Sequence, residues 1–373
     1  MNAMGYTIES LPLQTLLPAI GRAEDQLARL DEQVRRSPVG EGFVERGHFF
    51  DAAASMWVGG ELIHVEDLVL HDERMDARSP THELTIAHRI LRARRRIAGA
   101  KPGWAVSDAG LGALTGYEEQ EREAAEGEGR APADPPADLD LLGEDDPLAR
   151  ELATVDALLE QSQRLIDRVS HREGEGRSAL VVGDLVVRDS DWDEADRLAQ
   201  WKRVLQEVAD LPPTLGAALI WEAWESLEPM QRQHWLGSQF VSAYLRARGK
   251  VASHLFGFNV GLKAVPRERR RSANRLTRIL ALLDAMSSSA EAGMKEMARL
   301  THAREQMTRR LNGRRSSSSL PTAIELVLSR PLVSAPMIAK AAKVTQRGAL
   351  NLIGDLGIRE VTGRGRYRAW GIL

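Results

Sequence analysis

The C-terminal part of the chain contains the run Ile338-Ala339-Lys340-Ala341-Ala342-Lys343-Val344-Thr345. The small Ala339 would let two helices cross closely, Val344 would fill the core at a tight turn, and Thr345 is a good N-cap for a following helix. Lys343 stands where many such turns carry glycine, which implies a positive φ or a different turn geometry. The run therefore predicts the second helix and the turn of a helix-turn-helix motif.

The flanking residues extend this motif to a domain of residues 320–373. A first helix is expected over 320–329, and the recognition helix after Thr345 ends at Gly357, a C-cap residue. Residues 358–361 and 367–370 then read as two short strands around a basic tip at 362–366. Three helices followed by a hairpin predict a winged helix-turn-helix. One face of the recognition helix is apolar and consists of Ala349, Leu352, Ile353 and Leu356.

Basic and polar side chains on this domain suggest double-stranded DNA as the partner. With Ala349 buried, Arg347 and Asn351 lie on the opposite helix face, where arginine can pair with guanine and asparagine with adenine. In an extended wing, alternate arginines project from one side toward phosphates or the minor groove. The predicted DNA-binding residues are Thr345, Gln346, Arg347, Asn351, Arg364, Arg366 and Arg368. Small winged domains also serve as protein-docking modules, and this alternative stays open.

The charge distribution supports a polyanionic partner. The chain has 50 Lys and Arg and 53 Asp and Glu, a net charge of -3. Residues 263–373 hold 22 basic and 8 acidic residues, which leaves 28 basic and 45 acidic residues for 1–262. The two parts therefore carry +14 and -17, and the basic end is expected to meet the polyanion. Six arginines between 267 and 278 either extend the DNA surface or pair with the acidic part.

The rest of the chain reads as mainly α-helical. Residues 1–116 form a helical N-terminal region whose second helix is expected over about 44–71 and whose third begins at the N-cap Thr81. The first helix of this region has about 20 residues and stops at Ser37-Pro38. Its apolar stripe consists of Leu16, Leu17, Ile20, Ala23, Leu27, Leu30 and Val34.

An acidic segment and a serine-rich segment divide the chain. Residues 117–147 contain 12 acids, 2 arginines and four prolines and are predicted to be a disordered linker. Residues 148–311 form a helical core with a short β-hairpin at 179–188 and a helix capped by Asp193. Residues 312–319, with four serines, read as a hinge before the C-terminal domain.

Several classes of site are not expected. The chain has no cysteine, so it has no disulfide, thiolate nucleophile or cysteine-type zinc site. No apolar run reaches the ~18 residues of a membrane span, and the N-terminus does not resemble a signal peptide. We expect a cytoplasmic protein without membrane contact, and a homodimer is left open. His82 and His88 are six residues apart, unlike the zinc-binding pair of metalloproteases, so no metal site is predicted.

Parts of the sequence resemble two known groups of proteins. Residues 332–373 are similar to the C-terminal winged helix of many Fic-type proteins, in the stretch Leu356-Gly-Ile-Arg-Glu-Val-Thr-Gly-Arg-Gly-Arg-Tyr-Arg368. The whole chain resembles a family of alphaproteobacterial, rhizobial plasmid-type proteins with a C-terminal helix-turn-helix DNA-binding domain. Residues 51–68 are also similar to the N-terminal segment of Fic proteins, where a Ser-x-x-x-Glu-Gly motif blocks the nucleotide site. The resemblance implies a helical, Fic-like body.

The catalytic residues of Fic proteins do not carry over. Ser55 matches the inhibitory motif, but Gly59 occupies the glutamate position and Glu61 lies two positions on, about 200° around a helix. The Fic core His-Pro-Phe-x-(Asp/Glu)-Gly-Asn-(Gly/Lys)-Arg has its nearest counterpart at 254–263, which lacks the proline, the acid and the arginine. We therefore expect no enzyme activity, no catalytic residue and no cofactor. The predicted function is regulation of transcription or plasmid functions through DNA; the alternatives are AMP transfer, or a catalytically dead Fic-like docking scaffold.

Overall fold

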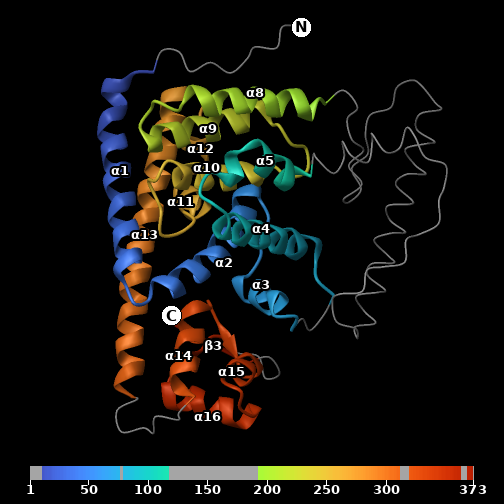
Figure 1. The fold of residues 1–373 in the computed structure, drawn as a ribbon, viewed down its shortest axis with the longest axis vertical. Helices are drawn as coiled ribbons and strands as arrows, with labels where there is room; N and C mark the ends of the chain where they lie inside the picture. The colour runs from blue at the N-terminus through green and yellow to red at the C-terminus, as the bar shows by residue number, and fades with distance from the viewer. Residues whose placement is uncertain (1–10, 76–78, 117–191, 311–318, 363–367, 373) are drawn as a thin grey trace, which may run out of the picture. The chain divides into compact units, whose positions relative to one another are not determined.

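The computed structural model of the protein describes residues 11–75, 79–116, 192–310, 319–362 and 368–372. These residues form α-helices and one small β-sheet (Figure 1). The helices before the C-terminal domain are α1 Leu13–Arg36, α2 Gly40–Gly59, α3 Val65–Asp72, α4 His82–Gly99, α5 Asp108–Thr115, α8 Glu194–Glu207, α9 Pro213–Leu227, α10 Leu236–Ala247, α11 Phe258–Ala264, α12 Arg267–Arg270 and α13 Arg275–Arg309, with a 3₁₀ turn η1 at Trp104–Val106. We call this part the helical body.

The first helix forms as its apolar spacing predicts. Helix α1 ends at the C-cap Ser37, and its buried stripe packs along the 35-residue helix α13, beside which it lies in Figure 1. Leu17 is the exception in the predicted stripe, because 58% of its surface is exposed. The other six residues of the stripe are buried, as expected for one face of an amphipathic helix.

The single helix expected over 44–71 is wrong. The structure has two helices there, α2 and α3, separated by residues 60–64. Gly60 adopts φ +99°, a left-handed conformation that ends α2, and its N–H bonds back to the helix at Trp57 O. The reason is local: a pair of glycines at 59 and 60 supplies a C-cap that the apolar periodicity of the segment does not reveal.

Two predicted N-caps of the helical body are confirmed, because the Thr81 hydroxyl accepts a hydrogen bond from Leu84 N and Asp193 accepts one from Asp196 N. Asn274 caps α13 in the same way by accepting from Thr277 N. Each satisfies a backbone donor that the first helical turn leaves unpaired. The acidic segment 117–147, the hairpin at 179–188 and nearly all of the hinge at 312–319 lie outside the described residues.

A buried polar network fixes the centre of the helical body. Arg94 is fully buried and forms an ion pair with Asp51, and it also donates to Gln239 Oε1 at 2.9 Å and to the carbonyl oxygen of Leu255 at 3.1 Å. Asp51 in turn accepts from the backbone N–H of Asn259 at 2.8 Å. Asp51 lies on α2, Arg94 on α4 and Leu255 in the segment after α10, so the network joins these three parts of the helical body.

The C-terminal domain consists of three helices and three short strands. The strands form an antiparallel sheet in the order β1-β3-β2, with Val333 paired to Trp370 and Arg359 paired to Gly371. The predicted pairing of the last two strands is confirmed, whereas β1 was not predicted. The elements are α14 Leu320–Ser329, β1 Val333–Ser334, α15 Ala335–Ala342, α16 Gln346–Leu356, β2 Arg359–Glu360 and β3 Ala369–Gly371.

Helix α14 packs directly against α2 of the helical body, and both belong to one compact unit of the chain. The contact is close at Gly42, where a Cβ atom would lie 2.8 Å from the carbonyl oxygen of Leu328. An ion pair from Arg330 to Glu45 of α2 at 3.2 Å reinforces it, and a second, from Arg304 to Glu325 at 3.0 Å, joins α14 to α13. The described residues therefore show the C-terminal domain docked on the body.

None of the helices in the described ranges is both long enough and apolar enough to cross a membrane.

Candidate nucleic-acid interface

The turn between α15 and α16 has the geometry that its sequence suggested. Lys343 ends α15 in the left-handed region, with φ 52° and ψ 45°, so of the two alternatives that the sequence left open the positive φ is the one observed. Thr345 then caps α16, because its hydroxyl accepts a hydrogen bond from Gly348 N at 3.1 Å. Ala349, Ile353 and Leu356 are buried on the inner face of α16. The helix-turn-helix is therefore present where the sequence placed it.

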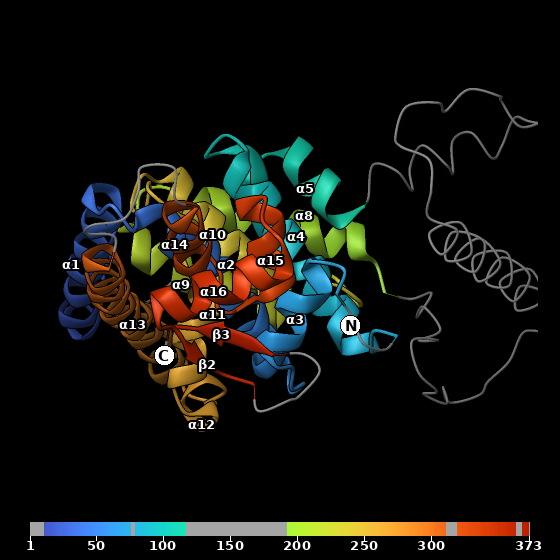
Figure 2. The ribbon, with the colours of Figure 1, turned by 90° about the horizontal axis from the view of Figure 1, so that it is seen from below.

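The outer face of α16 presents the predicted base-reading side chains to solvent. Gln346, Arg347 and Asn351 are all exposed, and neither Arg347 nor Asn351 has a hydrogen bond or ion pair within the described part of the chain. In Figure 1 α16 lies at the lower end of the C-terminal domain, away from α2, and in Figure 2, which is seen from below, it lies in front. A Cβ atom at Gly354 would meet nothing within 4 Å, so the backbone is open there. This face is therefore open to solvent.

Leu350 is a surface residue that the sequence reasoning missed. It lies three residues after Arg347 on α16, and 44% of its surface is exposed. An apolar side chain beside base-reading residues can contact the methyl group of thymine. The signal was available, because Leu350 falls outside the apolar face formed by Ala349, Ile353 and Leu356.

The structure describes only one of the three wing arginines. Arg368 is half-exposed and forms a double hydrogen bond to the carboxylate of Glu360, with Nη2 to Oε2 at 2.6 Å and Nε to Oε1 at 3.0 Å. Its guanidinium also lies 5.1 Å from the ring centre of Trp370. Any phosphate at this position would compete with Glu360. Arg364 and Arg366 lie outside the described residues.

The arginines between 267 and 278 pair in large part with acidic side chains of the helical body. Arg275 and Arg278 both bind the buried carboxylate of Glu222, at 2.9 and 2.8 Å, and Arg269 binds Asp284 at 2.7 Å. Of the two interpretations that the sequence left open, pairing with the acidic part of the chain holds for Arg275 and Arg278, whereas Arg269 pairs with Asp284 inside the basic part.

Three residues compared with Fic motifs, Ser55, His254 and Asn259, are buried in the helical body, whereas Gly59, Glu61 and Lys263 are exposed. Ser55 is buried on α2, and Asn259 is bound to Asp51 within the buried network. His254 is buried against Phe43, with ring centres 5.5 Å apart. Burial lowers the pKa of His254 to about 4, so the ring is neutral near pH 7.

The acidic histidine cluster at 64–88 forms ordinary side-chain contacts. His88 Nε2 lies 3.2 Å from Asp72 Oδ1, and Arg95 donates to the same carboxylate at 2.8 Å. Although partial burial alone would raise the pKa of Asp72, the hydrogen bonds from His88 and Arg95 lower it to about 2. Among the described residues, no three histidine or carboxylate side chains are placed to hold a metal ion.

Comparison with known proteins agrees with this arrangement. Residues 320–373 match the family described as "HTH DNA binding domain", and residues 186–312 match "Protein of unknown function (DUF1612)". An uncharacterised protein of Sinorhizobium fredii (strain NBRC 101917 / NGR234), y4cF, is 42% identical over 380 residues, covering 99% of this chain and 100% of that protein. The chain belongs to the same family as this rhizobial protein. This chain thus joins a DUF1612 segment to a C-terminal helix-turn-helix DNA-binding domain.

Proposed function

We propose that the protein is a cytoplasmic regulator that binds double-stranded DNA through α16 and controls transcription or plasmid functions. The observation that carries the proposal is the exposed face of α16, where Arg347, Leu350 and Asn351 have no partner within the described residues. A charged side chain without a partner on the exposed face of a helix-turn-helix can form hydrogen bonds with the edge of a base.

The small sheet supports a winged-helix mode of binding. Strands β2 and β3 pair after α16, and the segment between them carries Arg364 and Arg366. In this arrangement α16 enters the major groove and the wing contacts phosphates or the minor groove. The +5 charge of residues 320–373, from 8 basic and 3 acidic residues, supplies the attraction to the backbone.

A pair of substitutions tests the division of labour between α16 and the wing. A preferred duplex is first selected from a random library with the full chain, and binding is then followed by fluorescence anisotropy at several salt concentrations. Arg347→Ala should weaken binding to the preferred duplex by roughly 1 to 3 kcal/mol and affect random DNA much less. Arg364→Ala should weaken all duplexes alike and reduce the slope of log affinity against log salt by roughly 0.9.

Arg203, which is exposed on α8 of the helical body, provides the matched control. Arg203→Ala should leave both affinities and the salt slope unchanged. Equal loss on preferred and random duplexes with Arg347→Ala would assign Arg347 to a phosphate instead of a base. Unchanged binding by both C-terminal variants would remove this face as the DNA interface.

We propose further that the protein is not an AMP transferase. The support is the burial of His254 against Phe43, together with the missing proline, acid and arginine of the Fic core in residues 254–263. A general base needs access to the proton that it removes. Transfer of labelled AMP from ATP to lysate proteins, abolished by His254→Ala, would contradict this.

A further inference from the structure

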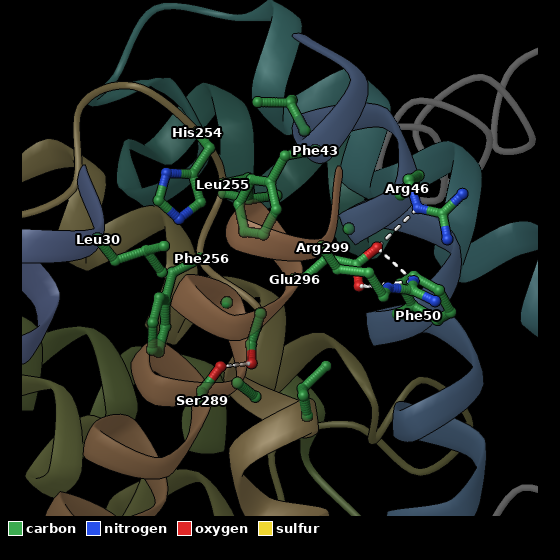
Figure 3. Close-up of a pocket in the computed structure, with 16 residues that line it drawn as sticks. Leu30, Phe43, Arg46, Phe50, His254, Leu255, Phe256, Ser289, Glu296 and Arg299 are labelled. Atoms are coloured by element: carbon green, nitrogen blue, oxygen red, sulfur yellow. Dashed lines mark hydrogen bonds and ion pairs between the residues drawn. The ribbon is translucent and has the colours of Figure 1, made fainter. Parts of the chain in front are cut away.

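The helical body contains a cavity beside the C-terminal domain. It lies between α2, α13 and the segment 254–260, and its volume is about 360 Å³, within the range of small-molecule sites (Figure 3). Gly257 and Gly293 keep part of the wall open, and Ala292 is exposed at its edge. The wall is mainly apolar and includes Leu30, Phe43, Phe50, Leu255, Phe256 and Val260.

One side of this cavity carries a net positive charge. Glu296 accepts from Arg46 Nε at 2.8 Å and from Arg299 Nε and Nη2 at 2.8 and 2.7 Å, as the dashed lines in Figure 3 show. Although burial alone would raise the pKa of Glu296, the two guanidinium groups lower it, so the carboxylate is ionised at neutral pH. Two guanidinium groups and one carboxylate leave one positive charge without a counterion among the lining residues.

The apolar side of the cavity contains an unsatisfied polar atom. The Ser253 hydroxyl donates its single proton to Asp31 at 2.7 Å, so the Nδ1–H of His254 donates to the Ser253 oxygen at 2.9 Å. Nε2 of the neutral ring is then a bare acceptor, and it is buried without a hydrogen-bond partner among the described residues. Buried polar atoms without partners are rare, so this atom marks a place where the contents of the cavity can donate a hydrogen bond.

The two arginines also hold the C-terminal domain. Arg46 Nη1 donates to the carbonyl oxygen of Arg330, just before β1, and Arg299 Nη1 donates to the carbonyl oxygen of Ile372 at 2.7 Å, just after β3. The guanidinium groups that give the cavity its charge therefore join the helical body to one end of the antiparallel β1–β3 pair, where β1 begins and β3 ends. We call these two hydrogen bonds the arginine clamp.

We propose that the cavity binds a small, mainly apolar molecule with a single carboxylate. This carboxylate accepts hydrogen bonds from Arg46 and Arg299 that these side chains otherwise donate to the C-terminal domain. A monoanion matches the unbalanced charge, and the apolar wall accepts the rest of the molecule. A bound carboxylate competes with neutral carbonyl groups for the same N–H donors, and the charged acceptor forms the stronger hydrogen bond. Binding thereby loosens the arginine clamp, whether or not DNA is present.

The first test measures binding to the full chain with 8-anilinonaphthalene-1-sulfonate, an aromatic monoanion whose fluorescence rises in apolar sites. We expect decanoate to displace this probe at least tenfold more effectively than decan-1-ol or decylamine, which share its chain but not its charge. Arg299→Met should abolish the preference for decanoate. Equal displacement by all three compounds would overturn the assignment of the charged side.

Two tryptophan substitutions on α13 locate the probe. Ala292→Trp fills the edge of the cavity and should lower the probe's affinity at least tenfold, whereas Ala298→Trp, also exposed on α13 but outside the cavity, should leave it unchanged. Both positions are exposed, so both variants should fold. Equal affinity in the two variants would mean that the probe binds elsewhere, which overturns the site.

The second test follows hydrogen exchange of the backbone amides in residues 330–334 and 369–372. Decanoate should speed their exchange several-fold, whereas decan-1-ol should not, because only the carboxylate competes for the arginine clamp. Unchanged exchange at saturating decanoate would overturn the coupling to the C-terminal domain. Neither experiment contains DNA, so either result is independent of the function proposed above.

Discussion

His48 and His254 lie inside the helical body, with 2% and 7% of their surfaces exposed. Burial lowers the pKa of His254 to about 4 and holds the pKa of His48 well below its ordinary value, with a further contribution from Arg94 in both cases. Both rings must therefore stay neutral in the folded protein. In the unfolded chain they take up protons near pH 6.5, so acid favours unfolding.

We predict that the free energy of unfolding falls as the pH drops below 6.5. Between pH 6 and pH 5 each buried histidine should contribute a loss of about 1 kcal/mol, because the unfolded state binds more protons there. A hydrogen bond to Glu225 raises the pKa of His234, so protonation of this ring stabilises the folded protein. That stabilisation is already present below pH 6.5 and does not offset the loss between pH 6 and pH 5. Urea unfolding at pH 7, 6 and 5 measures the slope.

A single substitution isolates one of these histidines. His254→Leu should remove about half of the loss between pH 6 and pH 5, whereas His302→Leu, which replaces an exposed histidine on α13, should keep the slope. If His254→Leu and the unaltered protein lose stability in parallel, the ring of His254 is not held neutral.

At the level of elements, the turn of the helix-turn-helix contains a measurable strain. Lys343 has φ 52°, where a side chain costs about 1 kcal/mol relative to glycine. Lys343→Gly should therefore raise the free energy of unfolding by up to about 1 kcal/mol, as measured by urea denaturation.

Lys340, three residues earlier and exposed within α15, gives the matched control. Lys340→Gly removes the same side chain from an ordinary helical position and should lower the free energy of unfolding by about 1 kcal/mol. Both variants lose one positive charge, so charge cannot explain opposite signs. A decrease in both variants would show that the Lys343 side chain makes a stabilising contact in the turn.

At the level of the whole molecule, docking of the C-terminal domain depends on the closeness of α2 and α14. A Cβ atom at Gly42 would lie 2.8 Å from the backbone oxygen of Leu328, which cannot move without shifting α14. Gly42→Ala should therefore destabilise the protein by roughly 1 to 3 kcal/mol, the usual result of overpacking. Hydrogen exchange should show faster opening in α14 than in α1.

Gly21 on α1 is the control for this substitution, because a Cβ atom there would meet nothing within 4 Å. Gly21→Ala should stabilise the protein by about 0.5 to 1 kcal/mol through the better helix propensity of alanine. If Gly42→Ala behaves like Gly21→Ala, the two helices do not pack as closely as the structure shows.

The sequence by itself determined the local features of this protein. The N-caps at Thr81, Asp193 and Thr345 depend on interactions within a few residues, so residue type and spacing predict them. The left-handed conformation of Lys343 is equally local and is one of the two turn geometries that the sequence left open. The exposed face of α16 followed in the same way, because helical periodicity separates Arg347 and Asn351 from the buried residues.

Only the tertiary structure decided which distant segments meet. Strand β1 has two residues, too few for an alternating pattern, and it forms because β3 lies beside it. The docking of α14 at Gly42 and the cavity between α2 and α13 join positions more than 200 residues apart, as in the hydrogen bond from Arg46 to Glu296. No local pattern encodes such a contact, because its free energy comes from burying and pairing groups that the chain brings together only when it folds.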